Sequence, residues 1–157
     1  MSEVLPTGLR LYRLLSTAGE PLTSILLARR LARGKELDDR IGERRGETAA
    51  ERPAGPLVWL HGASVGELMS VLPLIERLSA RGLNVLVTTG TVTSSGVAAQ
   101  RMPGGVIHQF MPLDVPNFVA RFLDRWQRHL ALCVESGLWP NMLLETARRK
   151  VPMVLVN

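Results

Sequence analysis

The residues best suited to chemistry lie in one loop of small residues, His61-Gly62-Ala63-Ser64-Val65-Gly66-Glu67. The loop follows an apolar run at 57–60, which predicts a buried strand, and precedes a helical pattern over 66–80. In open α/β sheets, ligands bind at the carboxyl ends of strands. Small residues let a ligand approach the backbone, and Glu67 adds a group that can accept a proton. The alternative is that Glu67 only caps the helix.

Polar side chains also follow three further apolar runs, where those strands are expected to end. They are Thr88, Thr89, Thr91 and Thr93 after the second run, Asp114 after the third, and Glu135, Trp139 and Asn141 after the fourth. Right-handed crossovers place all these loops at one edge of a sheet. The mixture suits a polar, hydroxyl-rich ligand. The run Thr91 to Ser95 would cap a helix N-terminus in any case, and the glycine-containing turn before it could also bind an anion such as phosphate.

Strand and helix patterns alternate from residue 57 to the end. Strands are expected at 57–60, 84–88, 106–110, 130–134 and 153–156, with helices at 66–80, 93–101, 116–126 and 140–150 between them. This order predicts the α/β class, with a Rossmann-like, doubly wound parallel sheet of five strands. A sheet that stops on a strand suggests the N-terminal piece of a longer protein.

Two segments precede the sheet domain expected at 56–157. Residues 1–33 form two amphipathic helical patterns divided by Pro21, which fits the first turn of the second helix. Arg10, Arg13, Arg29 and Arg30 make this segment basic, which favours contact with an anionic membrane surface. Docking on the protein itself is the alternative. Residues 34–55 are charged and are interpreted as a connecting segment, with a short helical piece at 40–45.

Several function classes are excluded or disfavoured. The net charge of +5 comes from scattered arginines with few aromatics, which disfavours nucleic acid. The single cysteine, Cys133, lies in an apolar run and indicates a core thiol, so we expect no disulfide and no metal site. Neither a dinucleotide fingerprint nor a P-loop is present. Gly62 to Gly66 matches the G-x-S-x-G of hydrolases, which leaves Ser64 open as a nucleophile, although His108 and His129 fall in or beside strands.

Four motifs in order and spacing resemble the N-terminal half of the bacterial 3-deoxy-D-manno-octulosonic acid (Kdo) transferases. They are His61-Gly-Ala-Ser-Val-Gly-Glu67, Thr88-Thr89-x-Thr91-x-Thr93-x-x-Gly96, Pro112-Leu-Asp114 and Glu135-Ser-Gly-Leu-Trp-Pro-Asn141. Leu11-Tyr12-Arg13 and Gly42-Glu43-Arg44 match the lead-in of that family. The resemblance implies one half of a GT-B glycosyltransferase on the cytoplasmic face of the inner membrane, bound peripherally.

The resemblance also implies the roles of both substrates and of single residues. The N-terminal domain would receive a lipid A precursor, and an absent C-terminal domain would bind the donor CMP-Kdo, with no other cofactor. Glu67 would be the general base. The acceptor would contact His61, Ser64, Gly66, Thr88, Thr89, Thr91, Thr93, Asp114, Glu135, Trp139 and Asn141.

One departure from the family pattern concerns the fourth motif. Family members often carry a second acid where this chain has Gly137, so only Glu135 remains there. We expect the chain alone to be inactive, because the donor half is missing. Two other hypotheses stay open: a stand-alone glycolipid- or phosphate-binding module, and a serine hydrolase that uses Ser64.

Overall fold

Five parallel strands form the centre of the molecule in the computed structural model, which describes residues 5–134 and 139–156. The strands are β1 Leu57–His61, β2 Asn84–Thr89, β3 Ile107–Phe110, β4 Leu130–Val134 and β5 Met153–Val156. Their order in the sheet is β3-β2-β1-β4-β5, and every neighbouring pair is parallel. The predicted class and the doubly wound sheet are therefore confirmed.

The strand order places a ligand crevice beside β1. From β1 the chain moves outward through β2 to β3, and it then returns to the other side of β1 to form β4. In the β1–β4 pair, His61 lies opposite Cys133. Connections that leave two neighbouring strands in opposite directions open a crevice at their carboxyl ends. The loop from His61 to Glu67 lies at this crevice. Cys133 is buried, and burial raises the pKa of its thiol to about 11, as befits a core residue.

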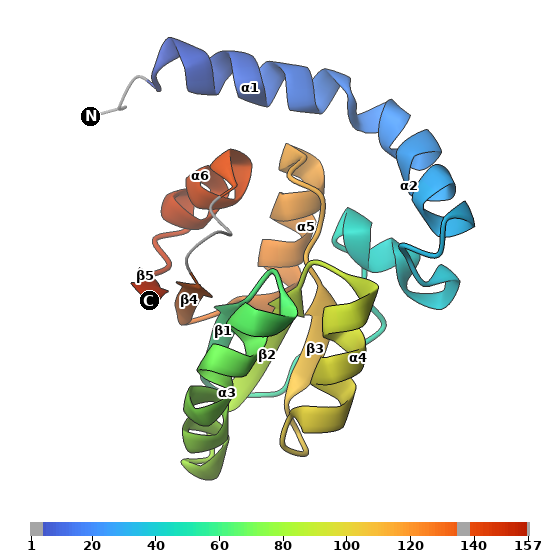
Figure 1. Cartoon of the computed structure of the whole chain (residues 1–157). Helices are drawn as coiled ribbons and strands as arrows, with labels where there is room; N and C mark the ends of the chain where they lie inside the picture. The colour runs from blue at the N-terminus through green and yellow to red at the C-terminus, as the bar shows by residue number, and fades with distance from the viewer. Residues whose placement is uncertain (1–4, 135–138, 157) are drawn as a thin grey trace.

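Two helices cover each face of the sheet, as Figure 1 shows. Helices α3 Val65–Ala80 and α4 Val92–Arg101 pack on the face that carries Val58 and Leu60. Helices α5 Pro116–Trp126 and α6 Pro140–Arg148 pack on the face that carries Leu57 and Trp59. Successive strand residues point to opposite faces, so a strand that is apolar throughout must be covered on both sides. The observed bounds lie within one or two residues of those expected.

Helices α1 Thr7–Ala18 and α2 Thr23–Ala32 pass over the carboxyl edge of this sheet (Figure 1). The 3-10 helix Glu20–Leu22 joins them, and Pro21 lies in its first turn rather than in the first turn of α2 itself. The predicted break at Pro21 is confirmed. No residue of α1 is fully buried, and α2 buries Thr23 and Leu27.

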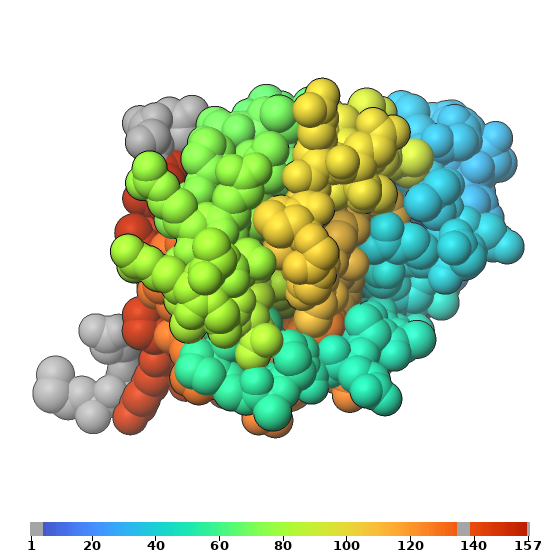
Figure 2. All heavy atoms as spheres, turned by 90° about the horizontal axis from the view of Figure 1, so that it is seen from below, coloured from blue at the N-terminus to red at the C-terminus, as the bar shows by residue number. Residues whose placement is uncertain are grey.

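The charged segment 34–55 packs against the sheet domain. Its short helical piece is a 3-10 helix, Asp38–Arg45, whose Arg40 and Arg44 guanidinium groups lie 4.6 and 4.5 Å from the centre of the Phe110 ring. Gly46 follows with φ +75°, and a side chain there would collide with the backbone carbonyl of Phe118 in α5. Figure 2 shows this segment lying along the side of the domain. The segment therefore adds side chains to the fold while it connects two parts of the chain.

Candidate active site

Glu67 is held at the start of α3 by a reciprocal cap. Ser64 Oγ accepts a hydrogen bond from the Glu67 backbone N–H at 3.3 Å and donates to Glu67 Oε1 at 3.2 Å. Glu67 Oε2 accepts from the Ala63 N–H at 2.8 Å. Thus Glu67 does cap the helix, and the same bonds fix its carboxylate at the carboxyl end of the central strand. The helix N-terminus favours negative charge at this point.

The geometry of Ser64 does not support the hydrolase hypothesis. A nucleophile elbow places its serine on a sharp, strained turn, whereas Ser64 has an extended backbone with φ −117° and ψ 169°. Its hydroxyl bonds Glu67, and no histidine hydrogen-bonds it within the described part of the chain. Ser64 therefore acts as a helix cap.

His61 is a buried, neutral imidazole, and only one of its two ring nitrogens has a hydrogen-bond partner among the described residues. Its Nδ1 lies 2.9 Å from Thr88 Oγ1, which also accepts a hydrogen bond from Trp59 Nε1 at 2.9 Å. Burial lowers the pKa of His61 to about 4, although Thr88 and the nearby charge of Glu67 act in the opposite direction. The ring is therefore uncharged at neutral pH. Its Nε2 is buried and has no hydrogen-bond partner among the described residues.

A hollow of about 280 Å³ adjoins His61 at the carboxyl edge of the sheet. The residues that line it are Arg30, Glu36, Arg44, His61, Ala63, Gly90, Met111, Pro112, Leu113, Asp114 and Trp139. The Gly90 N–H donates to the Ala63 carbonyl at 3.1 Å, and a Cβ at Gly90 would approach that oxygen to 2.9 Å, so the first two loops meet closely. Trp139 is 50% exposed. The hollow thus combines apolar walls with a few polar groups, as ligand sites do.

The predicted threonines fall into two groups. Thr88 and Thr89 are buried, and Thr89 Oγ1 lies 2.9 Å from His108 Nε2, so both hydroxyls are used inside the protein. Thr91 and Thr93 are exposed. Thr91 begins α4 in a reciprocal cap with Ser94, which confirms the expected capping role of this run. Contact of the threonines with an acceptor stays a prediction, with the exposed pair the better placed.

Asp114 caps α6 from a distant loop. Its carboxylate accepts from the backbone N–H groups of Asn141 and Met142 at 3.0 and 2.9 Å, in the first turn of a helix that has no side-chain cap of its own. It also accepts from Tyr12 Oη at 2.9 Å. Burial raises the pKa of Tyr12 to about 12, and Asp114 adds to that shift. Asn141 Nδ2 donates to Ser16 Oγ at 2.9 Å. The third and fourth motifs therefore hold α1 in place.

Glu135 lies outside the described residues. Arg44 and Glu36, which the sequence did not suggest as site residues, form part of the wall of the hollow. Buried Arg44 donates to Glu36 Oε2 at 2.8 Å, to the Met111 carbonyl at 3.0 Å and to the Gly90 carbonyl at 2.8 Å, which joins the loops after β2 and β3. A charged stretch looks like a solvated surface in sequence, and only the resemblance of Gly42-Glu43-Arg44 to the family lead-in singled out Arg44.

The described residues contain no group of three or more His, Cys, Asp or Glu side chains that could hold a metal ion. Among the same residues, no helix is both long and apolar enough to span a bilayer.

The site and the fold define a Rossmann-like α/β domain with a carboxylate at the carboxyl end of its central strand, and the family follows from its relatives. Residues 39–157 match the family described as 3-deoxy-D-manno-octulosonic-acid transferase (kdotransferase). The chain therefore belongs to the Kdo transferases, which are glycosyltransferases.

Relatives extend the match to nearly the whole chain. A probable mitochondrial 3-deoxy-D-manno-octulosonic acid transferase of Arabidopsis thaliana is 38% identical over 150 residues, covering 94% of this chain and 34% of the relative. The corresponding transferase of Rickettsia bellii is 34% identical, over 95% of this chain and 36% of its own length. That of Bordetella pertussis is also 34% identical, over 96% of this chain and 37% of its own length. The chain thus spans about a third of these relatives. Among solved structures, the C-terminal domain of a Pyrococcus furiosus hydrogenase has a TM-score of 0.48 at 14% identity, covering 70% of this chain and all of that one.

Proposed function

We propose that this chain is the acceptor-binding part of an enzyme that transfers Kdo from CMP-Kdo to a lipid A precursor, with Glu67 as the general base. The observation that carries the proposal is the position of Glu67, whose carboxylate is fixed by Ala63 and Ser64 at the end of the central strand. Membership of the Kdo transferase family supports the class of reaction.

The proposed chemistry needs one base and no acid. An acceptor hydroxyl attacks the anomeric carbon of the donor sugar, its proton passes to the Glu67 carboxylate, and the bond to the nucleotide phosphate breaks. Glycosidases must protonate their leaving group, whereas a nucleotide phosphate departs as a stable anion. The helix N-terminus favours the carboxylate form of Glu67, which is the form that can accept the proton. A positioned base of this kind contributes about 10²- to 10⁴-fold to the rate.

The hollow beside His61 is the proposed binding site of the acceptor sugar. His61 Nε2 would pair with a sugar hydroxyl, since a buried polar atom without a partner is costly. Trp139, half exposed at the rim, offers an aromatic face to a sugar ring. Thr91 and Thr93 lie at the start of α4, and Asp114 and Asn141 act by holding the wall of the hollow together.

Helices α1 and α2 are proposed to lie on the cytoplasmic surface of the inner membrane, where the acceptor resides. Large apolar side chains of these helices and of the 3-10 helix between them are exposed: Leu11, Leu14, Leu15, Leu22, Ile25 and Leu26. Apolar residues with flanking arginines favour an anionic interface. Arg10 and Arg29 are exposed, whereas Arg13 and Arg30 form ion pairs with Glu145 and Glu36 at 2.6 and 2.7 Å. The exposed Arg10 and Arg29 are therefore better placed to contact lipid.

The donor is proposed to bind outside this chain, in the remainder of a longer enzyme. On that basis residues 1–157 alone should show no turnover with CMP-Kdo and a lipid A precursor. A turnover rate equal to that of the complete enzyme would contradict the proposal that the donor binds outside this chain.

The test is Glu67→Gln in the complete enzyme. Glutamine keeps the shape of the side chain but cannot accept the proton, so kcat should fall about 10²- to 10⁴-fold while acceptor binding persists. Glu76→Gln is the matched control, because Glu76 is exposed on the same helix; its kcat should equal that of the wild type. Near-normal transfer by Glu67→Gln would remove Glu67 from the mechanism. Acceptor binding without transfer in the wild-type protein would instead identify a binding module.

A further inference from the structure

Arg128 is a buried cation at the end of the sheet opposite the Glu67 site. It lies two residues before the start of β4, and only 5% of its surface is exposed. The guanidinium carbon lies 5.0 Å from the ring centres of both Trp59 and Phe122. None of its three guanidinium nitrogens has a hydrogen-bond partner among the described residues. Every other buried arginine nitrogen in that part of the chain is paired, which makes Arg128 an exception.

An unpaired guanidinium at this depth calls for a counter-charge. Burial, followed by the nearby charge of Arg149, lowers the pKa of Arg128 to about 9, so the group is still protonated at neutral pH. The faces of Trp59 and Phe122 attract the cation, but they do not accept hydrogen bonds from its five N–H groups. Buried charges in proteins are normally paired or bound to an ion of opposite sign.

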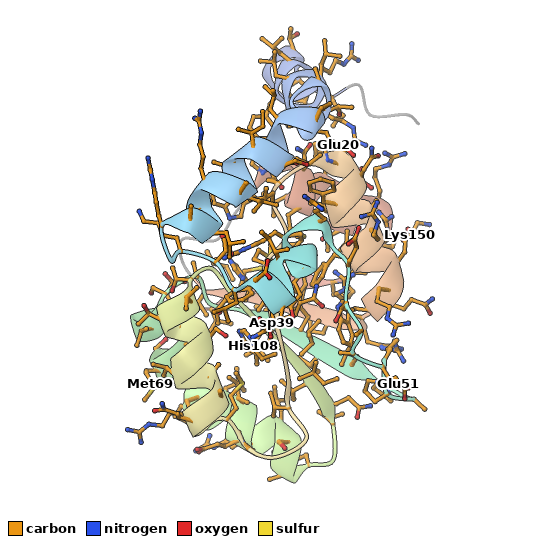
Figure 3. All side chains as sticks on the ribbon, turned by 90° about the vertical axis from the view of Figure 1, so that its right-hand side faces the viewer. Glu20, Asp39, Glu51, Met69, His108 and Lys150 are labelled. Atoms are coloured by element: carbon orange, nitrogen blue, oxygen red, sulfur yellow. The ribbon has the colours of Figure 1, made fainter. Side chains whose placement is uncertain are left out.

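A hollow of about 440 Å³ opens beside Arg128. Arg149 and Asp124 share its wall, and Arg149 binds Asp124 at 2.8 Å. The hollow therefore has two guanidinium groups and one carboxylate, and that carboxylate is already engaged and mostly exposed. Figure 3 shows Lys150, the residue after Arg149, on the outer surface at this end of α6. The local charge is positive.

The ends of two helices also lie at this hollow, and their free carbonyls would disfavour an anion. Arginines cover these carbonyls. Arg52 donates to the Trp126 carbonyl at 2.7 Å and to the Gln127 carbonyl at 3.1 Å at the end of α5. Arg149 donates to the Glu145 carbonyl at 3.1 Å in the last turn of α6. The negative ends of both helices are thus partly neutralised, and the positive field of the hollow remains.

We infer that this hollow is a second ligand site, which binds a small phosphate-class oxyanion between Arg128 and Arg149. Planar guanidinium groups suit the oxygens of phosphate, and each can donate two parallel hydrogen bonds. Because the nitrogens of Arg128 are covered, binding draws its side chain away from Trp59 and toward the hollow. The site lies at the amino ends of the strands, so it is separate from Glu67 and does not depend on the proposed transfer reaction.

The test is thermal unfolding of the intact protein with inorganic phosphate, against sodium chloride at the same ionic strength. Phosphate should raise Tm saturably and change the tryptophan fluorescence, and glycerol phosphate in a parallel series tells whether a phosphate ester also fits. Arg149→Ala should abolish the rise, while Arg148→Ala, whose side chain is 68% exposed, should retain it. No rise beyond that of chloride, or an equal rise in Arg149→Ala, would overturn the site.

Arg128→Met gives an independent signature. Methionine keeps the length and the apolar contacts of the side chain but removes the charge. Without phosphate the variant should have a Tm equal to or above that of the wild type, because an unpaired buried charge has gone, and phosphate should no longer raise it. A lower Tm in both conditions, together with no phosphate effect in the wild type, would mean that Arg128 serves packing alone.

Discussion

The sheet and the two N-terminal helices are held in place by different forces. Trp59 of β1 lies in the core on one face of the sheet, and Ile75 of α3 lies in the core on the other face. Both are completely buried. Helix α1 buries no residue fully and is attached by polar bonds, such as Tyr12 to Asp114 and Arg13 to Glu145. Its Leu14 and Leu15 are 65% and 62% exposed. Burial fixes the sheet, whereas directional polar bonds fix α1 and leave its leucines free to contact another apolar surface.

The largest difference is expected when an apolar side chain is shortened in each region. Ile75→Ala leaves a cavity under α3 and should lower the free energy of unfolding by about 2–5 kcal/mol. Leu15→Ala, the matched change in α1, should alter it by no more than about 0.5 kcal/mol. Urea unfolding measures both. Equal losses would show that α1 is part of the core.

Acid should weaken the sheet before it weakens the attachment of α1. The pKa values of His61 and His108 are lowered to about 4, with burial the main cause, so below pH 6.5 the unfolded chain takes up protons that the folded chain does not. Stability should therefore fall between pH 6.5 and 4, by roughly 3 kcal/mol for each histidine. His61→Gln should remove about half of that slope when urea unfolding is followed against pH.

The ion pair that holds α1 responds at lower pH. Burial alone would raise the pKa of Glu145, but hydrogen bonds from Arg149 and Arg13 lower it below its usual value. The pair therefore persists above that lowered pKa and is lost only as the pH falls through it. Hydrogen exchange of α1 that increases already at pH 6 would contradict this order.

A smaller effect is expected at the polar attachment of α1. Tyr12→Phe removes the hydrogen bond to Asp114 and should lower the free energy of unfolding by about 0.5–1.5 kcal/mol. Hydrogen exchange should show faster opening of α1 with β1 and β2 unchanged. Tyr12 is the single tyrosine of the sequence, so no second tyrosine can serve as a control. Thr17→Val is used instead, because it removes a hydrogen bond to the Arg13 carbonyl within α1.

A small effect on stability should accompany a large effect on membrane binding when the exposed leucines of α1 are made polar. Leu14→Ser with Leu15→Ser should leave the free energy of unfolding within about 1 kcal/mol, since both side chains are exposed. Flotation with vesicles that contain anionic lipid should show binding weakened about tenfold or more. Met69→Ser is the control, because Met69 is exposed and lies away from α1 and α2 (Figure 3). Unchanged binding of the double variant would contradict contact through this surface.

Much of the fold could be predicted because its signals are local. Short apolar runs such as 85–87 are typical of strands that are covered on both faces, and the break at Pro21 follows from the backbone preference of proline. The loop from His61 to Glu67 was also predictable, because a strand followed by small residues and a helix must end at the sheet edge. The burial of Thr88 and Thr89 was not, because residue type does not reveal which of two alternating strand faces has a polar partner.

The sequence by itself determined the class of fold, the family and the loop that carries Glu67, because these depend on periodicity and on motif spacing along the chain. Tertiary structure decided which polar groups remain available. It paired Thr88 with Trp59, placed Asp114 at the start of α6, and brought Arg44 from a charged segment into the wall of the hollow. Such pairings join residues far apart in the chain, and their energies depend on burial, which only the packed structure defines.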